Sequence, residues 1–462
     1  MAFAPNQIID CRIESLALGG KGVARTEGMV VFVAGGVPGA TVRAKLTKIA
    51  KRHAEAEVVE TVTPSPFAAE PFCPHFGTCG GCAHQDIAYD KQVEWKAAQV
   101  VETLSRLGGA RPETVLPPLP SPKTRYYRNK MEFAFVGPAR TLHLGLRQRA
   151  SHLVLDIETC FLQPEKCTNL LLAARQFGRE TGVNAFHPGA NKGFWRHLVI
   201  RNAAATGEIM LHLITTPEVK HFGAAKALGE HLMARPEAPA AFIHSTRSGA
   251  KESAFGQRRV LTMGLSHLEE RIGEVRYRLS PDAFFQTNTL AAEKLYQTVR
   301  ELAGLTGRET VYDLYCGVGG IGLYLAKGAG RVIGLELAHE AVADATDNAA
   351  LNGLTNCEFH AVDLQSPEAT VAGLPPPEVI VCDPPREGLD AGVLRLILEA
   401  RPKRLVYVSC DPATMARDVE RLAQAYAPKV LRSMDLFPHT PHMESVLALD
   451  LTDKPSSKET LG

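Results

Sequence analysis

The C-terminal part of the chain, residues 286–452, is predicted to fold as an α/β domain around a mostly parallel, doubly wound sheet. Apolar runs alternate there with helical segments, as in "TVYDLYCGVGG", "RVIGLELA", "PEVIVCDPP" and "RLVYVSCDP", and this alternation is typical of βαβ units. A glycine-rich turn follows the first run, and charged or thiol side chains stand where several runs end. Strand ends of this kind form the ligand-binding edge of α/β sheets.

Residues 1–62 are predicted to form a small all-β barrel, because short alternating apolar runs are separated there by glycine-rich turns. The stretch "TVRAKLTKIAKR" (41–52) carries five basic residues and no acidic ones, and "KTRYYRNK" (123–130) carries four basic residues around two tyrosines. Each stretch alone is most simply a solvated basic face. Together they favour a nucleic acid as partner.

Residues 63–285 are predicted to form a central α+β region, and residues 453–462 a disordered tail. A Pro-containing linker over 63–72 precedes a cysteine cluster and a helix over about 89–107. Strand-like and helical stretches then alternate up to the C-terminal domain.

The overall composition is that of an ordinary globular protein of two or three domains, with 462 residues, 45% hydrophobic and 22% charged. No apolar run approaches the roughly 20 residues of a membrane helix, and the N-terminus lacks the features of a signal peptide. We therefore expect a cytoplasmic protein without membrane contact. No oligomerisation helix or obligate protein partner is evident, so a monomer is expected.

Three of the ten cysteines, Cys73, Cys79 and Cys82, are clustered with C-x5-C-x2-C spacing. Disulfides are rare in cytoplasmic proteins, so the cluster indicates a metal. Zinc usually takes two C-x-x-C pairs or histidines, and the nearby His75 and His84 keep zinc open. A [4Fe–4S] cluster takes four thiolates, the fourth often remote in sequence.

The loop "VYDLYCGVGGIG" (311–322) contains the pattern G-x-G-x-x-G, and Glu336 ends the next strand about 20 residues on. This arrangement is typical of sites where backbone amides approach a nucleotide-like ligand and a carboxylate accepts ribose hydroxyls. NAD and S-adenosylmethionine sites both have it. Asp363 ends a third strand, and Asp383 ends a fourth in "CDPPREGL".

Cys410 stands where a strand stops and a helix begins. Asp411 is a good N-cap and Pro412 suits the first helical position, so the helix N-terminus is expected to lower the thiol pKa and favour a nucleophilic thiolate. In "HTPHMESV" (439–446), Glu444 lies between two histidines and the last strand, which makes it a candidate general base.

The motifs "SPDAFFQTN", "DLYCGVGG", "CDPPREGL", "SCDPATMARD" and "HTPHMESV" resemble those of S-adenosylmethionine-dependent RNA uracil-C5 methyltransferases. The resemblance is strongest to the bacterial 23S ribosomal RNA enzymes that carry an N-terminal TRAM domain and an iron–sulfur cluster. It implies a Rossmann-like class I methyltransferase domain over 286–452, an OB-like, RNA-binding TRAM barrel over 1–62, and a central α+β domain over 63–285 that holds a [4Fe–4S] cluster.

The resemblance also implies roles for individual residues. Cys410 would add to C6 of the uracil, Glu444 would remove the C5 proton, and Phe284 would lie near the target base. The implied contacts of S-adenosylmethionine are Gln286, Tyr315, Glu336, Asp363 and Asp383, the last between cofactor and base; the implied cluster ligands are Cys73, Cys79, Cys82 and Cys160, with Cys167 the alternative to Cys160. Two positions depart from the family pattern. Gly320 stands where relatives often have an asparagine, and Asp411 stands in place of the asparagine of the usual "SCNP".

Three other functions fit parts of the sequence. A methyltransferase for amino groups or a small molecule would use "DPPR" without needing Cys410. An RNA-binding assembly factor with a vestigial cofactor fold would need neither Cys410 nor Glu444. A transfer RNA enzyme of the same family would share the chemistry, although members of that branch typically lack the TRAM domain and the cluster.

Overall fold

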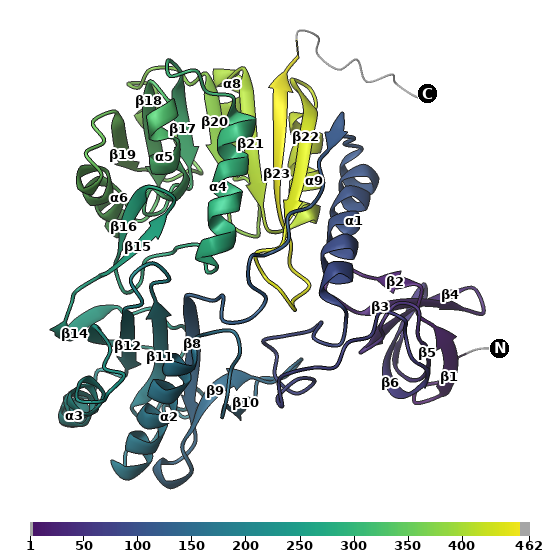
Figure 1. The fold of residues 1–462 in the computed structure, drawn as a ribbon, viewed down its shortest axis with the longest axis vertical. Coiled ribbons are helices and arrows are strands. Elements are labelled where there is room, and N and C mark those ends of the chain that lie inside the picture. Colours follow the sequence, from purple (N-terminus) through teal and green to yellow (C-terminus); the bar gives the residue numbers. More distant parts are fainter. Residues whose placement is uncertain (1–2, 453–462) are drawn as a thin grey trace.

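The computed structural model describes residues 3–452, and the predicted disordered tail, 453–462, lies outside them. Three regions are visible in Figure 1: an N-terminal barrel, a central sheet with two helices, and a C-terminal α/β unit. None of the helices over residues 3–452 is long and apolar enough to cross a membrane.

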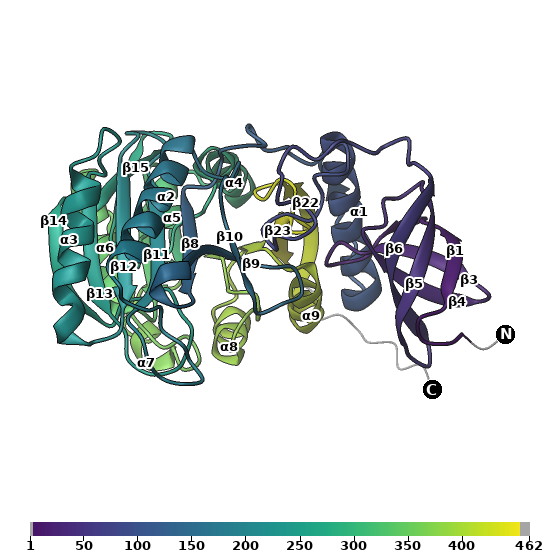
Figure 2. The ribbon, with the colours of Figure 1, turned by 90° about the horizontal axis from the view of Figure 1, so that it is seen from below.

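The N-terminal barrel has six strands, in the order β1-β5-β6-β4-β3-β2. They are β1 (Ile8–Arg12), β2 (Ser15–Leu16), β3 (Gly22–Thr26), β4 (Met29–Ala34), β5 (Thr41–Ile49) and β6 (His53–Thr63). Alternate residues of β4 and β5, such as Val31, Val33 and Leu46, are fully buried, as the sequence pattern predicts. Figure 2 shows the barrel beside helix α1, at the far end of the molecule from α3.

Helix α1 (Tyr89–Gly108) belongs with the C-terminal unit although it comes early in the chain. Its buried Val93, Val100 and Leu104 share one core cluster with the strands of the C-terminal sheet. The short strand β7 (Thr114–Val115) then pairs in parallel with β22 at the edge of that sheet. The C-terminal unit therefore recruits residues that precede position 120.

The central region is a seven-stranded sheet in the order β10-β9-β8-β11-β12-β13-β14, with α2 (Glu165–Glu180) and α3 (Phe222–Met233) packed together against it. The strands are β8 (Lys130–Val136), β9 (His143–Arg147), β10 (Val154–Asp156), β11 (Trp195–Asn202), β12 (Ile209–Thr215), β13 (Ala241–Thr246) and β14 (Arg258–Gly264); the short helices are η1 (Ala139–Thr141) and η2 (Val219–His221). The hairpin of β15 (Leu268–Ile272) and β16 (Val275–Leu279) leads into the C-terminal unit.

The C-terminal unit contains an eight-stranded sheet in the order β19-β18-β17-β20-β21-β23-β22-β7. The first five strands are parallel, and β23 is antiparallel to both its neighbours. The strands are β17 (Thr310–Leu314), β18 (Arg331–Glu336), β19 (Cys357–Ala361), β20 (Val379–Cys382), β21 (Arg404–Ser409), β22 (Tyr426–Met434) and β23 (Glu444–Leu451). The predicted doubly wound α/β sheet is therefore confirmed for this unit.

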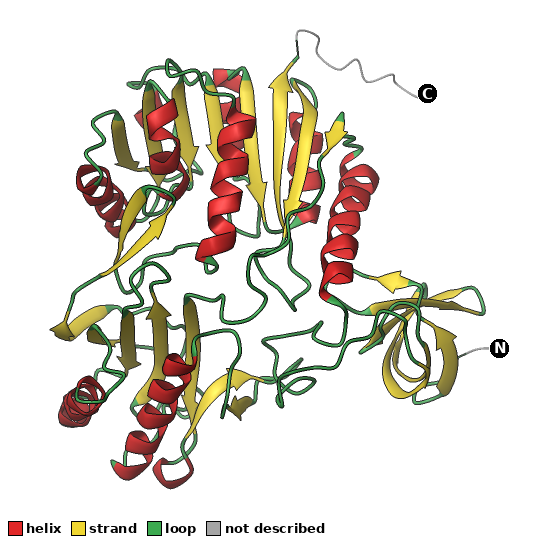
Figure 3. Cartoon of the chain, in the orientation of Figure 1, coloured by secondary structure: helices red, strands yellow, loops and turns green. Residues whose placement is uncertain are grey.

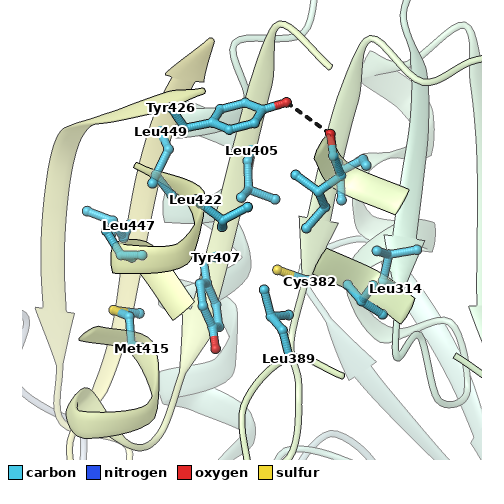
Figure 4. Packing of buried hydrophobic residues seen from close by; sticks show 14 of the residues in the cluster. Leu314, Cys382, Leu389, Leu405, Tyr407, Met415, Leu422, Tyr426, Leu447 and Leu449 are labelled. Carbon is cyan, nitrogen blue, oxygen red and sulfur yellow. Dashed lines mark hydrogen bonds between the residues drawn. The ribbon is translucent and has the colours of Figure 1, made fainter. Parts of the chain in front are cut away.

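Helices surround this sheet (Figure 3). They are α4 (Thr289–Ala303), α5 (Gly320–Leu325), α6 (His339–Leu351), α7 (Glu368–Val371), α8 (Ala391–Ala400) and α9 (Pro412–Leu422), with η3 (Ala326–Gly328) after α5. Figure 4 shows Leu405 and Tyr407 of β21 packed near Met415 and Leu422 of α9. This tightly packed apolar core fixes the strand ends on which the candidate site is built.

Candidate active site

The strand register brings Cys410 and Glu444 to one place in the sheet. Strands β21 and β23 are antiparallel, and Ser409 pairs with Ser445. The next positions in that register are Cys410 and Glu444, so two residues 34 positions apart in the printed sequence lie opposite each other where β21 ends and β23 begins. The structure thus joins the two residues that the sequence predicts to be catalytic.

The local structure at Cys410 matches the prediction, but its electrostatics differ. The Asp411 carboxylate accepts hydrogen bonds from the amides of Ala413 (2.8 Å) and Thr414 (3.2 Å), with Pro412 at the first helical position. Burial, followed by the Glu444 charge, raises the pKa of the Cys410 thiol to about 12. The expected lowering by the helix N-terminus is therefore outweighed by desolvation.

Glu444 is 3% exposed, and its Oε2 has no hydrogen-bond partner within residues 3–452. Burial, reinforced by the charge of Asp383, raises the pKa of Glu444 to about 8. The Arg386 guanidinium acts in the opposite direction on both Glu444 and Cys410. A carboxylate whose pKa lies near neutrality and that has a free oxygen is suited to accept a proton.

Asp383 follows β20 and lies at the same edge of the sheet. Its Oδ2 accepts a hydrogen bond from Gln286 Nε2 at 3.0 Å, and burial raises its pKa to about 6. Gln286 is in turn fixed by the buried Asn129, whose amide nitrogen donates to the Gln286 carbonyl at 2.8 Å. Asp383 and Gln286, predicted separately from the sequence, therefore form one hydrogen-bonded pair.

The glycine-rich loop connects β17 to α5 beside this pair. Tyr315 has a positive φ of 62°, and its hydroxyl donates to Asp390 Oδ2 and accepts from the Asp390 amide, each at 3.0 Å. Glu336 Oε2 accepts the amide of Gly317 at 3.1 Å. Asp363 follows β19 and accepts the Gln365 amide at 2.9 Å. Glu336 and Asp363 therefore lie at the ends of two adjacent parallel strands, β18 and β19.

Two functional candidates were not predicted. Asp313, on β17, is buried, its pKa is raised to about 7 by burial, and its Oδ2 accepts the Gly322 amide at 2.8 Å. Its position in the apolar run "TVYDLY" is the signal that sequence reasoning passed over. Arg386 lowers the pKa of both Cys410 and Glu444, and its Nη2 is 3.2 Å from His442 Nε2. The motif "DPPR" contains this arginine, but only the aspartate of the motif was predicted from the sequence to have a role.

The segment that leads into Glu444, residues 435–443, is here called the catalytic loop. Lys96 of α1 donates to Asp435 Oδ1 at 2.7 Å and to the Thr440 carbonyl at 3.2 Å, and both side chains of the Lys96–Asp435 pair are essentially buried. Gln92 Oε1 accepts the amide of His439, a residue with φ of 64°. Helix α1 therefore holds this loop in place.

The four predicted metal ligands come together in a second place, here called the cysteine pocket. Cys73, Cys79, Cys82 and Cys160 line one cavity whose other walls include Leu146, Ile157 and Leu162. Burial raises the thiol pKa of Cys79 and Cys160, and that of Cys82 to about 11. Cys167 lies on α2 and does not line this cavity.

The cavity brings four thiols together, which is the donor set predicted from the sequence. Within residues 3–452, however, no group of three or more His, Cys, Asp or Glu side chains is arranged as a metal site. Of the two histidines that keep zinc open, His84 does not line the cavity, whereas His75 does, with its Nε2 accepting the Glu158 amide. Four thiols around an apolar-walled cavity match the ligand number of a [4Fe–4S] cluster.

The cysteine pocket and the catalytic loop are in direct contact. The amides of Ala83 and His84, next to Cys82, donate to the His439 carbonyl at 2.7 and 3.1 Å. The buried Tyr127 donates its hydroxyl to the Pro438 carbonyl at 3.0 Å. The amides on either side of it, of Tyr126 and Arg128, donate to the carbonyls of Phe161 and Leu162 in the pocket wall, so the stretch 123–130 contacts both sites.

The basic stretch 41–52 on β5 is partly neutralised. Arg43 pairs with Asp10 and Glu60, and Lys48 pairs with Glu55. Lys45, Lys51 and Arg52 form no ion pair with any described residue. These three cations remain available to a polyanion.

Family models match two parts of the chain. The model described as tRNA (uracil-5-)-methyltransferase matches residues 255–373 and 377–452. A TRAM domain model matches residues 4–59. Together these matches cover the barrel and the α/β unit that carries Cys410 and Glu444.

Relatives match nearly the full length. The chain is 43% identical over 452 residues to an uncharacterized RNA methyltransferase of Nitratidesulfovibrio vulgaris, covering 97% of each chain. It is 35% identical over 450 residues to another from Halalkalibacterium halodurans, covering 96% of this chain and 97% of the relative. The crystal structure of Pyrococcus abyssi tRNA (uracil-54, C5)-methyltransferase in complex with S-adenosyl-L-homocysteine superposes with a TM-score of 0.75, at 26% identity, covering 96% of this chain and all of that one.

Proposed function

We propose that this chain, which belongs to the RNA (uracil-5-)-methyltransferase family and carries an N-terminal TRAM domain, methylates C5 of a uridine in 23S ribosomal RNA through a covalent Cys410 adduct. The observation that carries the proposal is the pairing of Cys410 with Glu444 across β21 and β23, beside Asp383. A methyltransferase for amino groups would need neither the thiol nor the opposing buried carboxylate.

The residues support a balanced reaction. Bound S-adenosylmethionine supplies an electrophilic methyl group on a sulfonium. The Cys410 sulfur adds to C6 of the uracil, the C5–C6 π electrons move toward C4–O4, and C5 becomes nucleophilic enough to take the methyl group. Glu444 then removes the C5 proton, the C5–C6 double bond re-forms, and the Cys410 thiolate leaves.

Because the pKa of Cys410 is raised, neighbouring positive charge is needed to stabilise its thiolate. A thiol with a pKa of about 12 is almost entirely protonated at neutral pH. Arg386 and the N-terminus of α9 are the groups near it that favour the thiolate. We therefore assign Arg386 the role of stabilising negative charge on Cys410 as it adds and leaves.

S-adenosylmethionine fits the edge formed by β17, β18, β19 and β20. We assign Glu336 to the ribose hydroxyls and Asp363 to the adenine, with Tyr315 as a further contact of the cofactor. Gln286 and Asp383 face the point where cofactor and base would meet. Phe284, 67% exposed in the segment before α4, is assigned to the incoming base, which must leave its stack to reach Cys410.

The choice of 23S ribosomal RNA rests on the barrel and the cysteine pocket, which the resemblance associates with that branch of the family. A transfer RNA substrate is the second candidate. It is favoured by the fold match over 96% of this chain to a tRNA (uracil-54, C5)-methyltransferase. Both substrates use the same chemistry at Cys410.

The cysteine pocket is proposed to hold a [4Fe–4S] cluster through Cys73, Cys79, Cys82 and Cys160. When bound, such a cluster would cross-link two segments that are remote in sequence. The Gly81 amide donates to Cys79 Sγ at 3.4 Å, a contact of the kind that stabilises ligating thiolates. Its proposed role is structural, supporting the fold and RNA binding.

Trapping on RNA that contains 5-fluorouridine tests the function. Fluorine at C5 cannot be removed as a proton, so the Cys410–C6 bond should persist after methyl transfer. We expect a denaturation-resistant protein–RNA adduct with 23S ribosomal RNA that requires S-adenosylmethionine and disappears in Cys410→Ala. An adduct with transfer RNA alone would favour the second candidate; methyl incorporation without any adduct would refute the nucleophile.

A further inference from the structure

The first residue of α5, Gly320, has its side-chain position occupied by another residue. A Cβ atom built at Gly320 would lie 2.6 Å from the hydroxyl oxygen of Tyr296 and 3.5 Å from its Cζ. Tyr296 comes from the middle of α4, so its hydroxyl reaches across to the start of α5. This is also the position where the sequence lacks the asparagine that related chains often have.

The Tyr296 hydroxyl is a polar group without a protein partner. The side chain is 3% exposed, and its hydroxyl forms no hydrogen bond with any residue from 3 to 452. By contrast, the hydroxyl of Tyr277, in the same core cluster, donates to the Gly320 carbonyl at 2.8 Å. The Tyr296 oxygen is not among the fully enclosed unpaired polar atoms of the described residues, so the hydroxyl is open to a hydrogen bond from a bound molecule.

The surroundings of the hydroxyl indicate which ligand it meets. Helix α4 packs against β20 and α5, and after burial the charges of Asp383 and Asp313 raise the pKa of Tyr296, so the hydroxyl lies near the end of β20 and near β17. Glu336 and Asp363 lie on the other side of β17, toward β18 and β19. The ribose and adenine contacts are therefore on one side, and Tyr296 is on the side left for the amino-acid end of the cofactor.

We propose that Tyr296 is a cofactor-positioning residue whose hydroxyl, standing in the side-chain place of Gly320, hydrogen-bonds the amino-acid end of S-adenosylmethionine. The inference rests on the proposed function, because it assumes that this edge of the sheet binds that cofactor. It adds a contact from α4 to those that the sequence motifs supply. It also explains why position 320 holds glycine: a side chain there would displace the hydroxyl.

Calorimetric titration of the RNA-free full chain with two ligands tests the inference. S-adenosylhomocysteine carries the amino-acid end, and 5′-methylthioadenosine lacks it. Tyr296→Phe should weaken S-adenosylhomocysteine binding about 3- to 10-fold, the effect of one hydrogen bond, and leave 5′-methylthioadenosine binding unchanged. Tyr324→Phe is the matched control, since Tyr324 packs edge-on against Tyr296 at 5.7 Å between ring centroids.

A double substitution at positions 296 and 320 separates the loss of the hydrogen bond from a general folding defect. Gly320→Ala alone should disturb the site, because its Cβ meets the Tyr296 hydroxyl, whereas Tyr296→Phe/Gly320→Ala should fold and bind like Tyr296→Phe. Equal S-adenosylhomocysteine affinity in wild type and Tyr296→Phe would overturn the inference and leave the proposed function intact. A wild-type chain that binds neither ligand would overturn both.

Discussion

Cys410 in the active site and the cysteines of the cysteine pocket are alike in burial but differ in the charged groups around them. Burial raises the thiol pKa of Cys410 and also of Cys79, Cys82 and Cys160. The charged neighbours of Cys410 are Glu444, Arg386, Asp383 and Asp411. Those of the cysteine pocket are chiefly other thiols and the two arginines Arg128 and Arg149.

Because burial is common to both sites, the different functions proposed for them rest on the groups around each thiol. A single thiol opposite a carboxylate that can take a proton is equipped for addition and elimination. Four thiols around an apolar cavity are the arrangement proposed above to hold a [4Fe–4S] cluster. The two groups meet through the catalytic loop, because Ala83 and His84 donate to the His439 carbonyl.

The largest expected effect is the loss of activity on changing Cys410. Cys410→Ala removes the atom that adds to C6, so the turnover number should fall by roughly 10⁴-fold or more. S-adenosylhomocysteine affinity should be unchanged within about twofold. Cys357→Ala, at a half-buried cysteine on β19, should retain activity; comparable losses in both variants would mean that Cys410 acts only through folding.

Glu444→Gln should separate the two halves of the reaction. Addition and methyl transfer remain possible, but the C5 proton has no acceptor, so turnover should fall by about 10²- to 10⁴-fold. Ordinary uridine RNA should then give a denaturation-resistant adduct that carries the methyl group, visible by electrophoresis and mass spectrometry. Normal turnover without adduct would show that another group removes the proton.

The pH dependence follows from the raised pKa of Glu444. Below a pH of about 8 this carboxyl is mostly protonated and cannot accept the C5 proton; above it the carboxylate form dominates. The rate at which the methylated adduct breaks down in a single turnover, which is the step that needs this carboxylate, should therefore rise about tenfold between pH 7 and pH 9. Arg386→Ala should move the midpoint to higher pH, because the guanidinium lowers that pKa; a rate independent of pH would contradict the assignment.

The sequence predicted the α/β unit well because strand ends carry visible chemistry. Glycines, acids and Cys410 each follow an apolar run, and parallel strands place their ends along one edge. The sequence did not reveal that α1 and β7 belong to the C-terminal unit, because both come early in the chain. Helix α1 packs against α9, and β7 pairs with β22, through tertiary contacts that leave no local sequence pattern. The pKa of Cys410 was predicted in the wrong direction, because burial depends on the whole fold and outweighs the helix N-terminus.

Polar residues inside the core were the hardest to predict. Lys96, Gln92 and Asn129 look like surface residues in the sequence, yet all three are buried and fix the catalytic loop or Gln286. Their partners are more than 150 positions away along the chain. Such pairs leave no local pattern of hydrophobic periodicity for sequence analysis to detect.

The smallest expected effect on turnover comes from the cysteine pocket, and it tests whether the two thiol sites are coupled. Cys160→Ser should lose iron, measured by metal analysis and visible absorption of the purified chain, because Cys160 lines the cavity. Cys167→Ser is the matched control and should keep iron, since Cys167 is 1% exposed on α2 and lies outside the cavity.

Coupling predicts a second change in Cys160→Ser. Loosening the segment that holds His439 should raise amide hydrogen exchange across the catalytic loop, residues 435–443, and lower turnover by about tenfold or less. The Lys96–Asp435 pair should limit the loss, because it holds the same loop from α1 independently. Iron loss with unchanged exchange in the loop would show that the two sites, although in contact, act separately; iron retained in Cys160→Ser but lost in Cys167→Ser would reassign the fourth ligand.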